Sequence, residues 1–321
     1  MNDHGLKRDV ENDCKSKKCN IYISGLGMES SKGVISVVDG VNFNIIEKIK
    51  VSSDIRGVDV NNFTKLVYIA NITGNNVIVV DARVNKVVKK IEVGESPFYV
   101  RVNPNTNLIY VANRGSRFVS VIDGITNKVI NNIKTPKGSS QAKIDINLNT
   151  NRIYITNNGS NNITVVDGIS NSVLDYVDVD SAPSGIAVNP NTNKVYIGYN
   201  SSSTDYVTVL DEETNCILDN IVVEKRPQFL SVNPITNLIY VSNTTSGTIS
   251  VIDGSTDKVI RSMRVGVAPY DIAIDVFRNI VYVANYSSGD ISVIRGSDNT
   301  VIANLSPEIC GTWGVGTVVG V

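Results

Sequence analysis

The sequence predicts an all-β fold: a seven-bladed β-propeller with four antiparallel strands per blade, closed by a C-terminal strand that joins the N-terminal blade. Three observations predict it. One motif recurs seven times, each repeat holds four strand-like segments, and the N-terminal repeat lacks a first strand that the C-terminal segment can supply. The chain of 321 residues is long for one average domain, but a single propeller can use all of it.

The recurring motif is a tyrosine between two aliphatic residues, followed in most copies by asparagine, as in Ile153-Tyr154-Ile155-Thr156-Asn157. Successive copies are 42 to 46 residues apart, because the tyrosines are Tyr22, Tyr68, Tyr110, Tyr154, Tyr196, Tyr240 and Tyr282. A fixed period in this range is typical of a repeat architecture. The repetition also favours a packing role between blades for these tyrosines over a ligand-binding role.

Each repeat contains four short segments rich in Val, Ile, Tyr and Thr, which we name strands a, b, c and d. In the repeat that starts at residue 183 they cover residues 183–190, 194–198, 206–211 and 216–223. Asn, Asp, Gly and Pro separate them, and no segment has a helical period. One four-stranded sheet cannot bury its own faces, so the repeats are expected to pack side by side in a ring.

The spacing of the repeats predicts how the ring closes. In most copies the acid that ends strand c lies 19 residues before the first inward aliphatic of the next strand a, as from Asp39 to Val58, but from Asp123 to Ile144 it is 21. After the last repeat this step reaches residues 313–319, whereas residues 12–19 are too polar for a strand a. The C-terminal segment therefore completes the first blade. The alternative is an open solenoid with a frayed C-terminus.

These motifs resemble those of the YVTN β-propeller repeat family, whose signature matches Tyr154-Ile155-Thr156-Asn157. A companion signature, Asn-Pro-x-Thr-Asn followed by a strand with Tyr, occurs at residues 103–110, 189–196 and 233–240. The resemblance covers about residues 20–321. It implies similarity to surface-layer and secreted proteins of archaea and bacteria, and hence an extracellular or cell-surface location. Related propellers carry lyase, dehydrogenase-subunit or haem activities, but a fold does not determine a function.

Composition narrows the classes of partner. The formal net charge is -1, which gives no basic footprint for nucleic acid. The chain contains no run of 18 apolar residues, so no transmembrane segment is predicted. Residues 1–10 lack the apolar core of a secretory signal. We expect a polar, mobile tail over residues 1–18 and a single propeller over residues 19–321. The oligomeric state and the compartment stay open.

The residue types that carry most enzyme chemistry are rare in this chain. His4 is the only histidine, so the folded body cannot supply a histidine base, a Ser-His-Asp triad or a histidine metal ligand. The sequence therefore predicts no catalytic residue, no metal site and no cofactor. The cysteines Cys14, Cys19, Cys216 and Cys310 are either free or include a Cys19–Cys310 or Cys14–Cys310 disulfide at the closure.

Loops that differ between repeats are the best candidates for function, and these are the b–c and d–a loops, which share one face of the disc. The residues that open strand a ring the channel mouth on that face. They form a mixed rim suited to a glycan, peptide or protein, and those selected as ligand-binding are Arg56, Phe98, Tyr99, Lys143, Gln228, Phe229, Tyr270, Asp271 and Trp313.

Three functions are consistent with this pattern. The leading one is a non-enzymatic binding or cell-surface scaffold with its partner at the variable-loop mouth. The second is a lyase or hydrolase at the same mouth that uses carboxylate or tyrosine chemistry, and the third is a structural component of the cell envelope. A further alternative is that the aromatic residues of the rim only plug the channel.

A charged trio is predicted in the inner layer. One position after the first aliphatic residue of strand a, three neighbouring repeats carry Asp59, Arg101 and Asp145. A lone charge in so confined a place is costly, so a structural Asp59–Arg101–Asp145 bridge is expected. The rival hypothesis is that Arg101 reaches into the channel to hold an anionic ligand.

Overall fold

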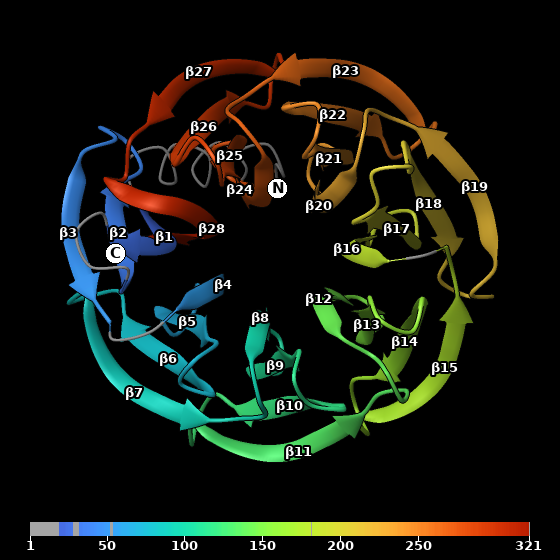
Figure 1. Ribbon diagram of the computed structural model, residues 1–321, viewed down its shortest axis with the longest axis horizontal. Helices are drawn as coiled ribbons and strands as arrows, with labels where there is room; N and C mark the ends of the chain where they lie inside the picture. Colours follow the sequence, from blue (N-terminus) through green and yellow to red (C-terminus); the bar gives the residue numbers. More distant parts are fainter. Residues whose placement is uncertain (1–18, 28–31, 52–53, 181, 321) are drawn as a thin grey trace, which may run out of the picture.

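A computed structural model describes residues 19–27, 32–51, 54–180 and 182–320, so the predicted tail over residues 1–18 lies outside the described residues. The described residues form seven separate four-stranded antiparallel sheets. Seen down the short axis, the sheets are blades arranged around a central axis, with strand a of each blade innermost and strand d at the rim (Figure 1). The predicted seven-bladed propeller is confirmed.

The first four blades follow the order a, b, c, d from the axis outward. Blade 1 consists of β28 (Ile309–Val319), β1 (Cys19–Gly27), β2 (Gly33–Asp39) and β3 (Ile45–Lys50). Blade 2 consists of β4 (Ile55–Asn61), β5 (Leu66–Asn71), β6 (Asn76–Asp81) and β7 (Lys86–Glu92). Blade 3 consists of β8 (Pro97–Asn103), β9 (Leu108–Asn113), β10 (Phe118–Asp123) and β11 (Lys128–Lys134). Blade 4 consists of β12 (Gln141–Asn147), β13 (Arg152–Asn157), β14 (Asn162–Asp167) and β15 (Ser172–Asp178).

The remaining blades repeat this order. Blade 5 consists of β16 (Pro183–Asn189), β17 (Lys194–Tyr199), β18 (Tyr206–Asp211) and β19 (Ile217–Val222). Blade 6 consists of β20 (Pro227–Asn233), β21 (Leu238–Asn243), β22 (Thr248–Asp253) and β23 (Lys258–Arg264). Blade 7 consists of β24 (Pro269–Asp275), β25 (Ile280–Asn285), β26 (Asp290–Arg295) and β27 (Thr300–Leu305).

The ring closes as predicted, because β28 pairs with β1 and becomes the innermost strand of blade 1. The pairing is antiparallel and places Cys19 opposite Val319 and Cys310 opposite Leu26. Cys19 and Cys310 thus lie at opposite ends of β1, and Cys19, Cys216 and Cys310 are all free thiols. Of the two alternatives for the cysteines, free thiols are confirmed for these three, and the Cys19–Cys310 disulfide is wrong, because β28 begins beside the end of β1 and not beside its start. Cys14 lies outside the described residues.

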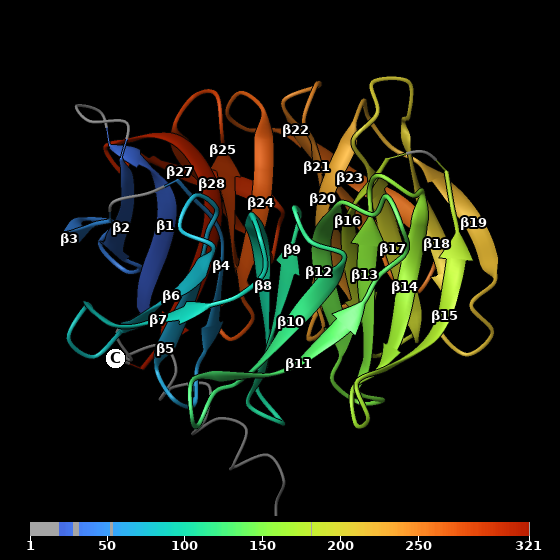
Figure 2. The same cartoon turned by 60° about the horizontal axis from the view of Figure 1, so that its bottom comes forward.

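The disc has two unlike faces, which Figure 2 shows from the side. The a–b and c–d turns lie on one, here called the turn face, and the b–c and d–a loops lie on the other, here called the loop face. The d–a loops that join consecutive blades have four residues, except for the six residues 135–140 between β11 and β12 and the three residues 306–308 between β27 and β28. The two extra residues of the loop over residues 135–140 account for the longer step of 21 residues from Asp123 to Ile144.

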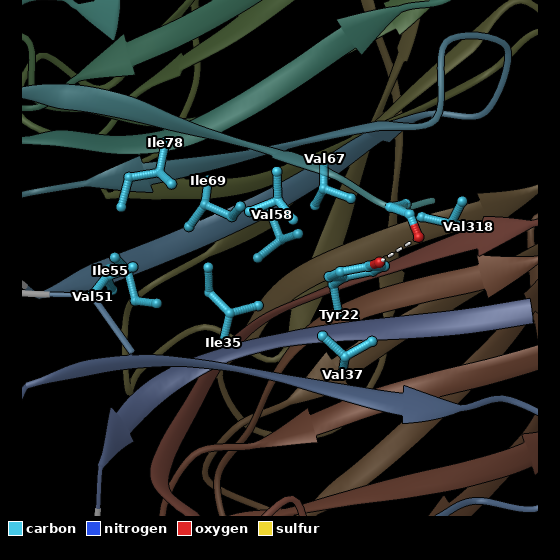
Figure 3. Packing of buried hydrophobic residues seen from close by; sticks show 12 residues of the cluster. Tyr22, Ile35, Val37, Val51, Ile55, Val58, Val67, Ile69, Ile78 and Val318 are labelled. Atoms are coloured by element: carbon cyan, nitrogen blue, oxygen red, sulfur yellow. Dashed lines mark hydrogen bonds between the residues drawn. The ribbon is translucent and has the colours of Figure 1, made fainter. Parts of the chain in front are cut away.

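The hydrophobic core consists of separate clusters between neighbouring blades. Figure 3 shows one of them, in which Tyr22 and Ile35 of blade 1 face Val58, Ile69 and other aliphatic residues of blade 2. All seven motif tyrosines are fully buried. Several of their hydroxyl groups donate to the c–d turn of the next blade, as from Tyr240 to Asn299 Oδ1 (2.9 Å). The predicted packing role of these tyrosines is confirmed.

Asparagines on the turn face fix the blades to one another. Asn103 Oδ1 accepts hydrogen bonds from the backbone of its own a–b turn, at Asn105 and Thr106, and its Nδ2 donates to Asn151 Oδ1 of the next blade (2.7 Å). Asn151 itself has a left-handed backbone (φ 56°), which asparagine tolerates better than most residues. The same arrangement recurs from Asn61 to Asn107, from Asn189 to Asn237 and from Asn233 to Asn279. The Asn-Pro-x-Thr-Asn signature is therefore an inter-blade connector.

The closing junction uses ions in place of this asparagine pair. Asp275 occupies the asparagine position in blade 7, and Arg278 Nε donates to Asp275 Oδ2 (2.6 Å). Arg278 Nη1 also donates to the carbonyl oxygen of Gly40 in blade 1 (2.9 Å). A single arginine thus connects the last blade with the first.

Candidate functional site

Residues from five blades meet at the centre of the loop face. Arg56, Phe98, Tyr270 and Trp313 lie there around a hollow of about 10 Å³, which has room for roughly one water molecule. Strand a is the innermost strand of every blade, so its opening residues converge on the axis. The channel is closed on this face by side chains.

An aromatic cluster covers the closed mouth. The ring centroids of Tyr270 and Phe229 are 4.1 Å apart, and Trp313 meets Tyr270 edge-on at 5.2 Å. Tyr286, from the b–c loop of blade 7, packs on Trp313 at 4.1 Å and is 39% exposed. The guanidinium of Arg56 lies 3.6 Å from the centroid of the Trp313 ring. Stacked aromatic rings with an arginine are suited to binding a flat ligand.

Three arginines act electrostatically on the hydroxyl group of Tyr270. Burial raises the pKa of Tyr270 to about 12, while the positive charges of Arg114, Arg56 and Arg226 counteract this rise. Asp54 pairs with Arg56, and Arg226 donates to Asn200 Oδ1 (2.8 Å). Arg114 stacks on Phe98, 3.8 Å from the ring centroid, and makes no ion pair within the described part of the chain. The centre of the loop face is therefore positively charged.

The sequence predicted only part of this site. Arg56, Tyr270 and Trp313 lie in the cluster and are partly exposed. The other predicted rim residues are buried, at most 7% exposed: Phe98, Tyr99, Lys143, Gln228, Phe229 and Asp271. Of these, only Phe229 stacks in the cluster. Sequence reasoning missed Arg114, Arg226 and Tyr286, which come from b–c and d–a loops. Their variation between repeats was the only signal that could have pointed to them.

A buried ion pair crosses the channel below the aromatic cluster. Lys143 Nζ, from blade 4, lies 3.0 Å from the carbonyl oxygen of Leu230 and 3.4 Å from Asp271 Oδ1 of blade 7. Asp271 Oδ2 also accepts from the backbone nitrogen of Val315 in blade 1 (3.4 Å). Burial raises the pKa of Asp271, and the charge of Lys143 opposes that rise. This pair supports the aromatic layer from beneath.

A second charged layer lies nearer the turn face. Arg101 Nη2 is 2.7 Å from Asp145 Oδ1, and Arg101 Nη1 is 3.6 Å from Asp59 Oδ2, which is ion-pair distance but too long for a hydrogen bond. Both carboxylates also accept backbone hydrogen bonds from the next blade, at Val102 (2.7 Å) and Val188 (2.8 Å). The structure thus places Arg101 between the two acids, and the trio touches blades 2 to 5.

A chamber of about 110 Å³ adjoins both charged layers and extends toward the turn face. Arg101, Lys143 and Asp145 line it together with aliphatic residues of strands a, and the a–b turn residues Leu148, Pro190 and Pro234 lie at its turn-face end. The Nε of Arg101 is buried and has no hydrogen-bond partner in the described part of the chain. A small polar ligand could use this donor.

No group of three or more His, Cys, Asp or Glu side chains within the described residues could hold a metal ion. No helix within them is long and apolar enough to cross a membrane.

Comparison with known proteins gives likenesses of fold. A family model described as "Lactonase, 7-bladed beta-propeller" matches residues 194–312. No curated protein matches the chain. Hydrazine synthase of Kuenenia stuttgartiensis is similar in structure, with a TM-score of 0.73, 16% identity, and coverage of 85% of this chain and 94% of that one. Dihydro-heme d1 dehydrogenase NirN in complex with DHE has a TM-score of 0.68, 11% identity, and coverage of 92% and 74%. At these identities, the two structures support the propeller fold alone.

Proposed function

We propose that this protein is a binding propeller that holds an acidic sugar at the centre of its loop face. The observation that carries the proposal is Arg114, whose guanidinium stacks on Phe98 and has no carboxylate partner in the described part of the chain. An arginine fixed by a ring and left without a counter-ion offers its donors to an anionic group. The repeat motif supports grouping the chain with the YVTN propellers and placing this site outside the cell or at its surface.

The surroundings of Arg114 match an anionic ring. Arg56 and Arg226 add positive charge near Tyr270, and Asp54 neutralises only one of the three arginines. The exposed Tyr286, which packs on Trp313, provides a flat apolar surface for the face of a sugar ring. Carboxylate recognition by arginine and ring stacking by tyrosine act on the two ends of such a ligand, which sets its orientation.

Isothermal titration with digalacturonate tests the proposal, with neutral maltose as the comparison ligand. The wild-type protein should bind the acidic disaccharide and not the neutral one. Arg114→Gln should weaken binding at least tenfold, because a hydrogen bond to a charged group contributes roughly 1.5–3 kcal/mol. Trp313→Ala and Tyr270→Ala should also weaken binding. The matched control is Arg261→Gln, an exposed arginine of β23, the outermost strand of blade 6.

Two outcomes contradict the proposal: equal binding of both sugars, or unchanged binding by Arg114→Gln. Tyr99→Ala is not a clean probe of this site. Tyr99 is 7% exposed and lies against Gly57, where an added Cβ would come within 2.7 Å of the Tyr99 ring. Its removal should therefore reduce stability as well.

A second candidate function is hydrolysis of a small lactone in the turn-face chamber. The match of residues 194–312 to a lactonase family favours it, and the chamber places the Asp145 carboxylate beside Arg101. There Asp145 would take a proton from water as the water oxygen attacks the ring carbonyl. The ring C–O bond would then break and its oxygen would gain a proton, which yields a hydroxy acid. Hydrolysis of γ-butyrolactone above the spontaneous rate, lost in Asp145→Asn, supports this function, and a rate equal to the spontaneous one excludes it for that substrate.

A further inference from the structure

A second hollow lies on the same face, toward the rim of blade 3. Its volume is about 360 Å³, which is within the usual range of ligand sites. Strands c and d of blade 3 and the loops at their loop-face ends form it. The lining residues are Arg117, Phe118, Asn132, Lys134, Thr135 and Lys137.

The charge of this hollow is entirely positive. Arg117, Lys134 and Lys137 are exposed, and none of them makes an ion pair within the described residues. No acidic residue lines the hollow. The exposed Glu95 adjoins the b–c loop of blade 3, where its backbone nitrogen donates to Ser116 Oγ (2.8 Å). The hollow therefore attracts anionic groups.

The hollow is held in shape by the one d–a loop that is longer than the rest. Thr135 Oγ1 and Ser139 Oγ are 2.8 Å apart, and the fully buried Gln141 donates to Ser139 Oγ (3.1 Å) and to the carbonyl oxygen of Ser116 (3.2 Å). The backbone nitrogen of Thr135 donates to the carbonyl oxygen of Arg117 (3.1 Å). Because the loop is ordered before any ligand arrives, binding there would cost little conformational entropy.

One short loop joins this hollow to the proposed sugar site. Arg114 faces the central cluster and Arg117 lines the hollow, and both belong to the b–c loop of blade 3 between β9 and β10. Three residues span at most roughly 10 Å. Positive side chains therefore run continuously from the axis to the rim of blade 3.

We infer that the ligand is an extended acidic polysaccharide, with one uronate unit at the central cluster and the following units running over Arg114 and Arg117 into the hollow of Lys134 and Lys137. This inference rests on the proposed function, because it adds an outer subsite to the same binding face. A chain with one carboxylate per sugar matches this track of cations, which the single acid Glu95 adjoins at Gly115.

The test compares digalacturonate with hexagalacturonate by isothermal titration. The hexamer should bind at least tenfold more tightly than the dimer. The double variant Lys134→Glu and Lys137→Glu should lose that gain and keep the affinity for the dimer. Raising the salt concentration should weaken hexamer binding more in the wild-type protein than in the variant. The variant has lost two cations, so salt has fewer charge contacts to screen there.

The matched control is Lys258→Glu with Arg261→Glu, which reverses two exposed cations on β23 of blade 6. It should bind both oligomers like the wild type. If the hexamer binds no more tightly than the dimer, or if the control loses the gain as fully as the Lys134 and Lys137 variant, the outer subsite is wrong and the central site stands. If neither oligomer binds, the proposed function fails and this inference fails with it.

Discussion

At the scale of the residue, Arg101 shows how far sequence reasoning can reach. Its two acidic neighbours were identifiable because each occupies the same position of strand a in an adjacent repeat, so blade order brings them together. Arg114 and Tyr286 were not identifiable in this way. They lie on loops whose conformation depends on local hydrogen bonds and not on the repeat, so no register predicts which loop side chains turn toward the axis.

Replacement of Arg101 separates a structural role from a ligand-binding role. Arg101→Met should lower the free energy of unfolding by about 2–3 kcal/mol, less than the roughly 3–5 kcal/mol usual for stranding a buried partner. The expected loss of stability is smaller than usual because Asp59 and Asp145 keep their backbone hydrogen bonds and because the arginine side chain is 34% exposed. Urea denaturation measures the change. Unaltered stability together with lost anion binding would favour the rival channel site.

At the scale of the element, the turns carry more information than the strands. Any alternating aliphatic segment predicts a strand, but the asparagine that ends strand a bonds both its own turn and the next blade. Sequence reasoning identified this signature and its turn chemistry, but not its bond to the neighbouring blade. The Cys19–Cys310 alternative was avoidable, because antiparallel pairing already places the start of strand a beside the end of strand b.

Asn189→Ala should therefore cost more than an ordinary loop substitution. Asn189 is fully buried, and its amide bonds Asn237 of blade 6 (2.6 Å) and its own turn at Asn191 (3.1 Å). We expect a loss of about 2 kcal/mol, since two buried hydrogen bonds disappear and Asn237 loses a donor. Thermal melting of this variant beside Asn131→Ala, an exposed asparagine of β11, measures the difference. Equal melting temperatures would show that the inter-blade bond adds no stability.

At the scale of the whole molecule, two charged layers link the entire ring. The trio around Arg101 touches blades 2 to 5, and the Lys143–Asp271 pair reaches blades 4, 6, 7 and 1. They share β12, which carries both Lys143 and Asp145. The sequence predicted the first layer but assigned Lys143 and Asp271 to an exposed rim. Burial of these two side chains depends on how closely the seven innermost strands approach the axis, which the sequence pattern does not give.

The Lys143–Asp271 pair predicts a pH-dependent defect. Lys143→Met leaves Asp271 buried without its cation, so the pKa of Asp271 should rise further above its unfolded value. A carboxyl group with a raised folded pKa binds its proton more tightly when folded, so stability falls as the pH rises through that pKa. The variant should thus melt well below the wild type at pH 7.5 and closer to it at pH 5. The double variant Lys143→Met with Asp271→Leu should recover most of the loss, and a gap that is constant with pH would refute this account.

Removal of the closing strand should affect the whole ring. Deletion from Gly311 onward takes most of β28 and exposes the inner edge of β1. An unpaired strand edge promotes association, and two blade faces lose their neighbours. We expect aggregation or loss of cooperative melting, measured by calorimetry and light scattering. A truncated protein that melts like the full-length chain would contradict the closing role of β28.

The pairing of Cys19 with Val319 also determines which face of the disc would point away from a support to which either end of the chain was attached. Strand a ends and strand b begins on the turn face, so the first residue of β1 and the last residue of β28 leave the disc side by side, away from Trp313 and Arg114. A tether at either end would hold the disc by its turn face. The arginines and aromatic rings of the loop face would then point outward, unobstructed by the support.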